Sequence, residues 1–142
     1  MKKLQKYGHL RHLWQLCHWV VLAGSILGAP HLQAATPQSE LQRWQNLAGQ
    51  TGDAAKGKVF FGQRQGGEWS CASCHGQPPT AASKHASTGK TIAALAPAFN
   101  AERLTDSAKV DKWFKRNCKD VLQRECTAIE KADVLAYLVS LK

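Results

Sequence analysis

The stretch Cys71-Ala72-Ser73-Cys74-His75 decides the fold of this chain. Two cysteines separated by two residues and followed by a histidine form the C-x-x-C-H pattern, which attaches haem covalently in c-type proteins. The thiols of Cys71 and Cys74 bond the porphyrin, and His75 lies beneath the iron as its proximal ligand. The motif occurs once in the 142 residues, so the sequence predicts one haem c per chain.

Two other kinds of site contain a C-x-x-C pair, and neither suits this sequence. A zinc site requires a second pair of ligands at a comparable spacing, and none follows. A thioredoxin-like redox pair lies in a βαβ frame, whereas the pattern around Cys71 and Cys74 is helical. Haem attachment is therefore the preferred interpretation.

The N-terminus has the three-part pattern of a secretory signal peptide. Its first twelve residues contain no acid and four bases: Lys2, Lys3, Lys6 and Arg11. An almost wholly apolar run follows at 19–29, and small residues stand at Ala34 and Ala35. We expect residues 1–35 to be removed by cleavage after one of these two alanines. Residues 36–142 then form one cytochrome c domain in the periplasm, where c-type haem is attached.

An uncleaved membrane anchor is the alternative to a signal peptide. Its apolar run, however, has about half of the roughly 20 residues that a membrane span needs, and no later segment resembles a span. The formal net charge of +9 includes the basic residues of the signal, so it does not imply nucleic-acid binding. A moderately basic domain suits an acidic redox partner or an anionic membrane surface equally well.

Apolar residues at helical spacing predict an all-α, single-domain c-type cytochrome fold with one covalent haem. Thr127 and Glu130 form a capping box that begins the last helix. The segment 77–89 is rich in Pro, Ser, Thr and Ala and is predicted to be a loop, and no alternating strand pattern occurs. The other predicted helices cover about 41–48, 53–61, 91–95 and 107–117.

The absence of a usable methionine is the second informative feature. Met1 is the only methionine, and it leaves with the predicted signal peptide. Electron-transferring c cytochromes of this size use methionine as the second axial ligand, so the sixth iron position is held by His85, by another donor or by nothing. His85 lies in a polar loop, where an exposed histidine is the simpler interpretation. Asn100 is a further candidate in a predicted turn.

Asn117 ends a stripe of residues at helical spacing. Val110, Trp113, Phe114 and Asn117 occupy positions i, i+3, i+4 and i+7, which share one face of a helix. An asparagine at the end of an apolar stripe points toward the core and is a possible iron ligand. An asparagine is equally favoured as a helix C-cap, and the spacing alone leaves both interpretations open.

Two cysteines remain after Cys17 leaves with the signal and Cys71 and Cys74 hold haem. Cys118 and Cys126 are eight residues apart. In an oxidising compartment, such a pair favours a disulfide over two free thiols.

The chain resembles the SHP (sphaeroides haem protein) family of oxygen-binding c-type cytochromes. The resemblance covers nearly all of the predicted mature domain, and its C-terminal half carries most of the specificity. The motifs that carry it are Trp113–Cys118, Arg124–Thr127 and Glu130–Asp133, with Ala96–Asn100 and Arg103–Asp106 upstream.

This resemblance implies specific roles for residues of this chain. It implies that Asn117 is the sixth ligand of the ferric haem, that Cys118 and Cys126 form a disulfide, and that His75 is the proximal ligand. It also implies that the reduced protein binds a small diatomic molecule. The expected electron donor is a dihaem c-type cytochrome or a membrane cytochrome b.

Three classes of function fit these features. The first is a diatomic-binding haem protein that accepts electrons from a cytochrome, with Asn117 as a redox-switched ligand. The second is a plain low-potential electron carrier whose sixth iron position never opens. The third is an enzyme that reduces oxygen, peroxide or a nitrogen oxide. The distal region has no obvious acid–base pair, although Lys115, Arg116 and Arg124 lie close in sequence, so the enzyme is the least supported.

Overall fold

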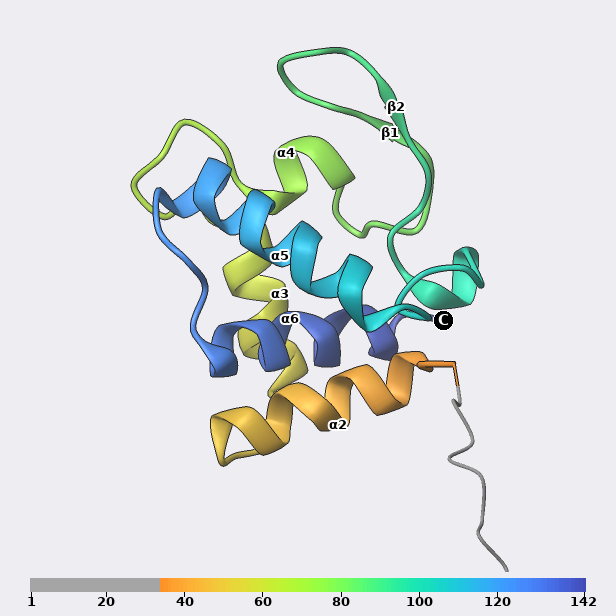
Figure 1. Cartoon of the computed structure of the whole chain (residues 1–142). Helices are drawn as coiled ribbons and strands as arrows, with labels where there is room; N and C mark the ends of the chain where they lie inside the picture. Colours follow the sequence, from red (N-terminus) through yellow and green to blue (C-terminus); the bar gives the residue numbers. More distant parts are fainter. Residues whose placement is uncertain (1–33) are drawn as a thin grey trace, which may run out of the picture. The chain divides into compact units, whose positions relative to one another are not determined.

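Helices dominate the computed structural model, which describes residues 34–142 (Figure 1). The predicted all-α fold is confirmed, and the predicted signal peptide lies almost wholly outside the described residues. No helix among the described residues is both long and apolar enough to cross a membrane. The elements are α2 (Pro37–Ala48), α3 (Ala54–Gly62), α4 (Cys71–His75), β1 (Ser83–Lys84), β2 (Thr91–Ile92), the 3-10 helix η1 (Pro97–Phe99), α5 (Ser107–Leu122) and α6 (Ala128–Ser140).

The helix α6 forms the centre of the core. Its residues Ala132–Leu138 are all buried, and it packs closely against both α2 and α3. A side chain at Gly57 of α3 would place its Cβ 1.9 Å from the backbone oxygen of Asp133 in α6. Only glycine permits this approach of two backbones, so Gly57 fixes the crossing of α3 and α6.

The start of α6 agrees with the sequence prediction. The Thr127 side chain accepts a hydrogen bond from the Glu130 backbone N–H at 3.3 Å, and the Glu130 carboxylate accepts one from the Thr127 N–H at 2.8 Å. These reciprocal bonds satisfy two backbone donors that the first turn of a helix leaves free. The predicted capping box is therefore confirmed.

The helix α5 is much less buried than α6. Only Val110, Cys118 and Val121 are buried in its sixteen residues, and α5 is not among the helices that pack closely against another helix of the described unit. Figure 1 shows α5 starting beside the first turns of α2 and then diverging from it. Much of its inner side lines a pocket, and Phe114 is the residue through which it packs against the core clusters.

The structure corrects three predictions about local elements, of which the first is that the predicted loop at 77–89 contains the strand β1. The helix α5 continues five residues past Asn117 and ends at Leu122, before Gln123 with φ 57°, because nothing in that stretch breaks a helix. The predicted helix at 91–95 is instead the strand β2, which pairs antiparallel with β1. Thr91 and Ile92 are β-branched and favour this extended backbone.

Candidate haem site

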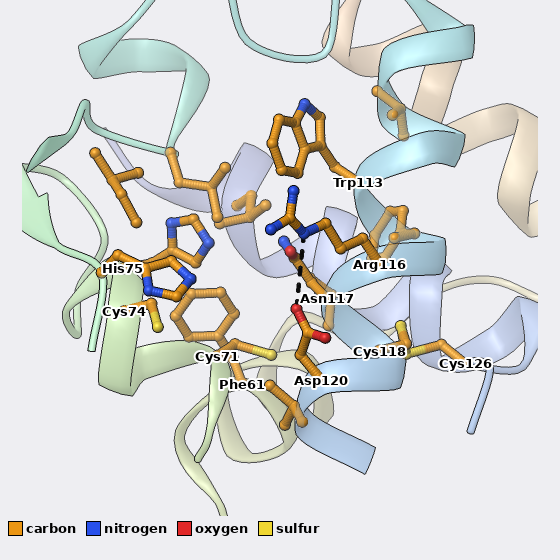
Figure 2. Close-up of a pocket in the computed structure, with 18 of the residues that line it drawn as sticks. Phe61, Cys71, Cys74, His75, Trp113, Arg116, Asn117, Cys118, Asp120 and Cys126 are labelled. Atoms are coloured by element: carbon orange, nitrogen blue, oxygen red, sulfur yellow. Dashed lines mark ion pairs between the residues drawn. A yellow bond between two sulfur atoms is a disulfide. The ribbon is translucent and has the colours of Figure 1, made fainter. Parts of the chain in front are cut away.

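A pocket of about 810 Å³ is lined by residues of α3, α4, α5 and α6 and of the loops between them, and Figure 2 shows part of this lining. This volume is within the range of cofactor sites. Apolar side chains form most of its walls, and they come from all four helices. The principal ones are Phe61, Cys71, Leu95, Trp113, Phe114, Val121, Val134, Leu135 and Leu138.

The single-turn helix α4 places the three motif residues together. Ser70 and Ser73 cap its start reciprocally, with bonds of 3.2 and 3.0 Å between side chain and backbone. Residues three and four positions apart share one face of a helix, so Cys71, Cys74 and His75 all line the pocket. The geometry of this short helix is therefore enough to place the three motif residues on one wall of the site.

Burial controls the chemical state of these groups. It raises the pKa of the Cys71 thiol to about 11, whereas reactive redox cysteines have a lowered pKa. Burial, followed by the charges of Arg103 and His85, lowers the pKa of His75 to about 4. Cys71 is therefore a neutral thiol near pH 7, and His75 is a neutral imidazole with a lone pair to donate.

The residues present fit a haem. His75 Nδ1 is buried and has no hydrogen-bond partner among the described residues, so the protein alone leaves this nitrogen unsatisfied. Two unpaired thiols lie beside it, next to an apolar pocket of suitable volume. No three His, Cys, Asp or Glu side chains between residues 34 and 142 gather to hold a bare metal ion.

Asn117 lies on the α5 wall, away from α4. Its side chain lines the pocket with Trp113 and Phe114, and Figure 2 shows it on a different wall from His75. Because α5 continues to Leu122, Asn117 stands inside the helix and is not its C-cap. The structure therefore supports the inward orientation and excludes the capping interpretation.

His85 lines the same pocket from the α4 side. Its ring Nδ1 is held by Ser87 at 3.2 Å. Its loop is fixed to the haem motif, since Ala86 N–H bonds Cys74 Sγ at 3.4 Å and Ser83 bonds the Cys74 carbonyl at 2.6 Å. His85 is therefore fixed on the same side of the pocket as the haem motif, and would be less suited than Asn117 to hold an iron from the other side.

Asn100 lies outside the pocket lining. Its side chain donates to the Ala94 carbonyl at 3.3 Å and accepts from the Glu102 N–H at 3.2 Å. Both bonds are local, so Asn100 serves the turn after η1.

A disulfide joins α5 to the segment before α6. Cys118 and Cys126 are bonded with their Cα atoms 5.5 Å apart, and both line the pocket near Asn117 (Figure 2). Cys118 lies within α5, four residues before its end, whereas the sequence prediction placed it just beyond the helix. The bridge therefore holds the body of α5, one residue from Asn117.

Comparison with known proteins agrees with this geometry. The family model described as "Domain of unknown function (DUF1924)" matches residues 47–138. The cytochrome c-type protein SHP of Cereibacter sphaeroides is 40% identical over 125 residues, which cover 84% of this chain and 96% of that protein. The chain belongs to the SHP family of c-type cytochromes.

Solved structures show the same fold as this SHP-family chain. Oxidised SHP, described as an oxygen-binding cytochrome c, is 42% identical, with 76% of this chain and 99% of that chain covered and a TM-score of 0.71. Oxidised cytochrome c'' from Methylophilus methylotrophus is 34% identical, with 75% and 94% covered and a TM-score of 0.67. The predicted c-type cytochrome fold and haem c cofactor are both confirmed.

Sequence reasoning missed the cationic residues on the rim of the SHP-family pocket. Arg103 lines the pocket while its guanidinium donates to the carbonyls of Ala94 at 2.9 Å and Ala93 at 3.0 Å. Lys90 and Lys109 also line it, and such cations suit the anionic propionates of a haem. No local pattern marks these residues, because they come from separate loops and helix ends.

Proposed function

We propose that this protein is a periplasmic monohaem cytochrome that binds a small diatomic molecule when reduced, after electron transfer from a cytochrome partner. The supporting observation is the position of Asn117, which faces the pocket from the wall that does not carry His75. The relative SHP is described as oxygen binding, which supports the same kind of ligand here.

Cys71 and Cys74 attach the haem through thioether bonds, and His75 is the proximal ligand. Their common face on α4 and the neutral imidazole of His75 support these roles. Neutral imidazole is the form of histidine that ligates metals. Export of the chain, with removal of residues 1–35, supplies the compartment in which this attachment occurs.

The amide of Asn117 acts as a redox-dependent ligand. Haem supplies an iron whose sixth position accepts different donors in its two oxidation states. An amide oxygen is a hard, neutral and weak donor, so it suits ferric better than ferrous iron. With a reduced iron, the Asn117 amide would be the more weakly held donor and would be free to move away. Its NH2 group is then free to donate a hydrogen bond to a diatomic molecule in the pocket.

The electron donor is a dihaem c-type cytochrome or a membrane cytochrome b. The family resemblance supports this choice of partner. The outer side of α5 adds exposed basic residues next to the pocket, which favour an acidic partner surface. They are Lys112, Lys115 and Lys119.

The test is the spectrum of Asn117→Ala with its haem attached. We expect the ferric form to change spin state and to bind water or added imidazole. We expect the reduced wild type to bind carbon monoxide without a competing internal ligand. Loss of bound oxygen should be several-fold faster in Asn117→Ala, since one hydrogen bond contributes about 1 kcal/mol.

Two control variants separate the alternatives. Asn100→Ala removes an asparagine that lies outside the pocket, so its ferric spectrum should match the wild type. His85→Ala should also leave the spectrum unchanged. If His85→Ala changes the ferric spectrum and Asn117→Ala does not, the proposed ligand is wrong. A reduced wild type that takes up no carbon monoxide would make the protein a plain electron carrier.

A further inference from the structure

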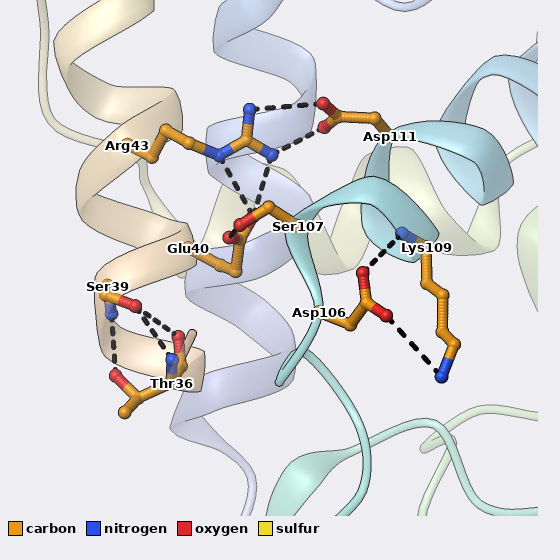
Figure 3. Close-up of polar contacts among 8 residues, drawn as sticks. All are labelled: Thr36, Ser39, Glu40, Arg43, Asp106, Ser107, Lys109 and Asp111. Carbon is orange, nitrogen blue, oxygen red and sulfur yellow. Dashed lines mark hydrogen bonds and ion pairs between the residues drawn. The ribbon is translucent and has the colours of Figure 1, made fainter. Parts of the chain in front are cut away.

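Glu40 is a buried carboxylate in a helix that forms no part of the haem pocket. It is only 1% exposed, and its Oε1 accepts a hydrogen bond from the hydroxyl of Ser107, the first residue of α5 (Figure 3). Its Oε2 accepts from Arg43 at 2.7 and 3.1 Å. The carboxylate therefore joins α2 to the N-terminal end of α5.

Arg43 makes a second connection between the same helices. Its guanidinium bonds Glu40 on one side and both carboxylate oxygens of Asp111 on the other, one of them at 3.4 Å (Figure 3). We refer to Glu40, Arg43, Ser107 and Asp111 as the Glu40 cluster. Both of its α5 residues lie in the first two turns of that helix.

Stability alone does not explain a buried carboxylate at this place. Removing an ion from water is costly, and replacement of a buried ion pair by apolar residues is often neutral or stabilising. What a bonded charge cluster does provide is one defined geometry, because each oxygen and N–H has a fixed partner direction. The Glu40 cluster defines how α5 sits against α2.

The middle and end of α5 have other attachments, among them a close approach of Gly67 to the Val121 backbone. Phe114 packs edge-on against Trp44 of α2, with ring centroids 6.2 Å apart, and the disulfide holds Cys118. Asn117 lies one residue before Cys118 and six after Asp111, about 9 Å along the helix axis. Because the disulfide lies one residue from Asn117, a tilt of α5 about it moves the Asn117 backbone little, whereas a turn of α5 about its own axis swings the Asn117 side chain toward or away from the pocket.

We propose that Glu40 and Arg43 are positioning residues for Asn117. By holding the first turns of α5 against α2, they set the reach of the Asn117 amide into the pocket and so the strength with which it closes the sixth iron position. A weak donor is sensitive to such displacement, because misplacement of a reacting group by about 1 Å has large effects. This inference rests on the proposed role of Asn117.

The test variant is Ser107→Ala/Asp111→Ala, which removes both attachments on the α5 side and leaves the ion pair within α2 intact. Glu40→Gln is a second variant that keeps the shape of the side chain. The measurement is the rate at which imidazole, used as a probe, binds the ferric holoprotein. We expect binding about three- to tenfold faster, the range that loss of one or two hydrogen bonds produces, with a ferric spectrum shifted toward that of Asn117→Ala.

Arg124→Gln is the matched control. It removes an ion pair of similar length, 2.7 Å to Glu130, but that pair does not involve α5. Imidazole binding should equal that of the wild type. If the Glu40-cluster variants lower only the midpoint of unfolding and bind imidazole at the wild-type rate, their role is structural and the inference fails.

The Asn117→Ala background separates this inference from the proposed function. If Asn117 is the ligand and the cluster acts through it, adding Ser107→Ala/Asp111→Ala to Asn117→Ala should not speed imidazole binding further. Additive effects would overturn the positioning role. A wild-type spectrum for Asn117→Ala itself would overturn the proposed ligand.

Discussion

The two long helices of the C-terminal half, α5 and α6, begin with similar caps but differ in how many of their residues are buried. Each starts with a side-chain cap, from Asp106 in α5 and Thr127 in α6. In α6, seven consecutive residues are buried, whereas α5 buries three residues in its whole length. The comparison shows that α6 supplies most of the packing of the fold, while α5 mainly supplies the wall of the pocket that carries Asn117.

The physical reason is the pocket. The helix α6 meets its neighbours directly, in places backbone to backbone, and buried apolar contact is the main source of stability. The helix α5 borders the pocket, so it is fixed by specific attachments, among them the Glu40 cluster, Phe114 and the disulfide. Substitutions in the α6 core should therefore change unfolding, and substitutions that loosen α5 should change the ferric spectrum.

The largest loss in the free energy of unfolding is expected for a substitution at the crossing of α3 and α6. In Gly57→Ala, the new Cβ lies 1.9 Å from one backbone atom of Asp133 and 2.4 Å from another, and neither can move without separating the helices. We expect a loss of about 3 kcal/mol or more in the free energy of unfolding, at the upper end of overpacking effects. Guanidinium unfolding followed by circular dichroism measures it.

Gly62→Ala is the matched control in the same helix. Its Cβ would meet only the end of the Gln77 side chain, which is flexible and can turn aside. We expect a loss below about 1 kcal/mol. Equal losses in the two variants would contradict the backbone contact between α3 and α6.

Removal of the disulfide tests how α5 is held in place. Cys118→Ser/Cys126→Ser opens a short loop, for which the chain-entropy relation gives about 2–3 kcal/mol. Unlike Gly57→Ala, this variant should also change the ferric spectrum, because Asn117 is the neighbour of Cys118. Alkylation of the native wild type without reductant, followed by mass spectrometry, should find neither thiol modified. Two modified thiols would show that the pair is not bridged.

The smallest loss of stability is expected at the start of α6, where Glu130 of the capping box forms an ion pair with Arg124. The hydrogen bond from Arg124 lowers the pKa of Glu130 from its model-compound value of 4.5. Glu130→Gln should cost about 1 kcal/mol near pH 7, as loss of a helix cap does, with little from the half-exposed ion pair. The ferric spectrum should not change.

The pH dependence of Glu130→Gln has a definite sign. A carboxylate with a lowered folded pKa stabilises fully above its unfolded pKa, and this stabilisation is lost as the pH falls through the folded pKa. The stability difference between wild type and variant should therefore be constant near pH 7 and shrink below about pH 4. A difference that persists unchanged at pH 2 would mean that the charge of Glu130 contributes nothing.

Local patterns in the sequence determined much of this protein. The C-x-x-C-H stretch, the capping box at Thr127 and Glu130 and the stripe from Val110 to Asn117 all depend on residues within two turns of one another. Such contacts are set by helical geometry itself. Three predictions about local elements were wrong, including the loop at 77–89, which contains β1. The predicted end of α5 at Asn117 was too early, because no residue there breaks a helix. The predicted helix at 91–95 is a strand, because Thr91 and Ile92 pair with β1.

Only the tertiary structure decided which candidates face one another. The sequence leaves both His85 and Asn117 as candidate iron ligands, and the tertiary structure places His85 beside Cys74 and Asn117 on a different wall from His75. The sequence predicts nothing special at Glu40, yet it is buried and accepts a hydrogen bond from Ser107, 67 positions away. Gly57 gave no sign of its contact with Asp133. These relations depend on how whole helices pack, and helix packing joins residues whose separation in the sequence carries no repeating pattern.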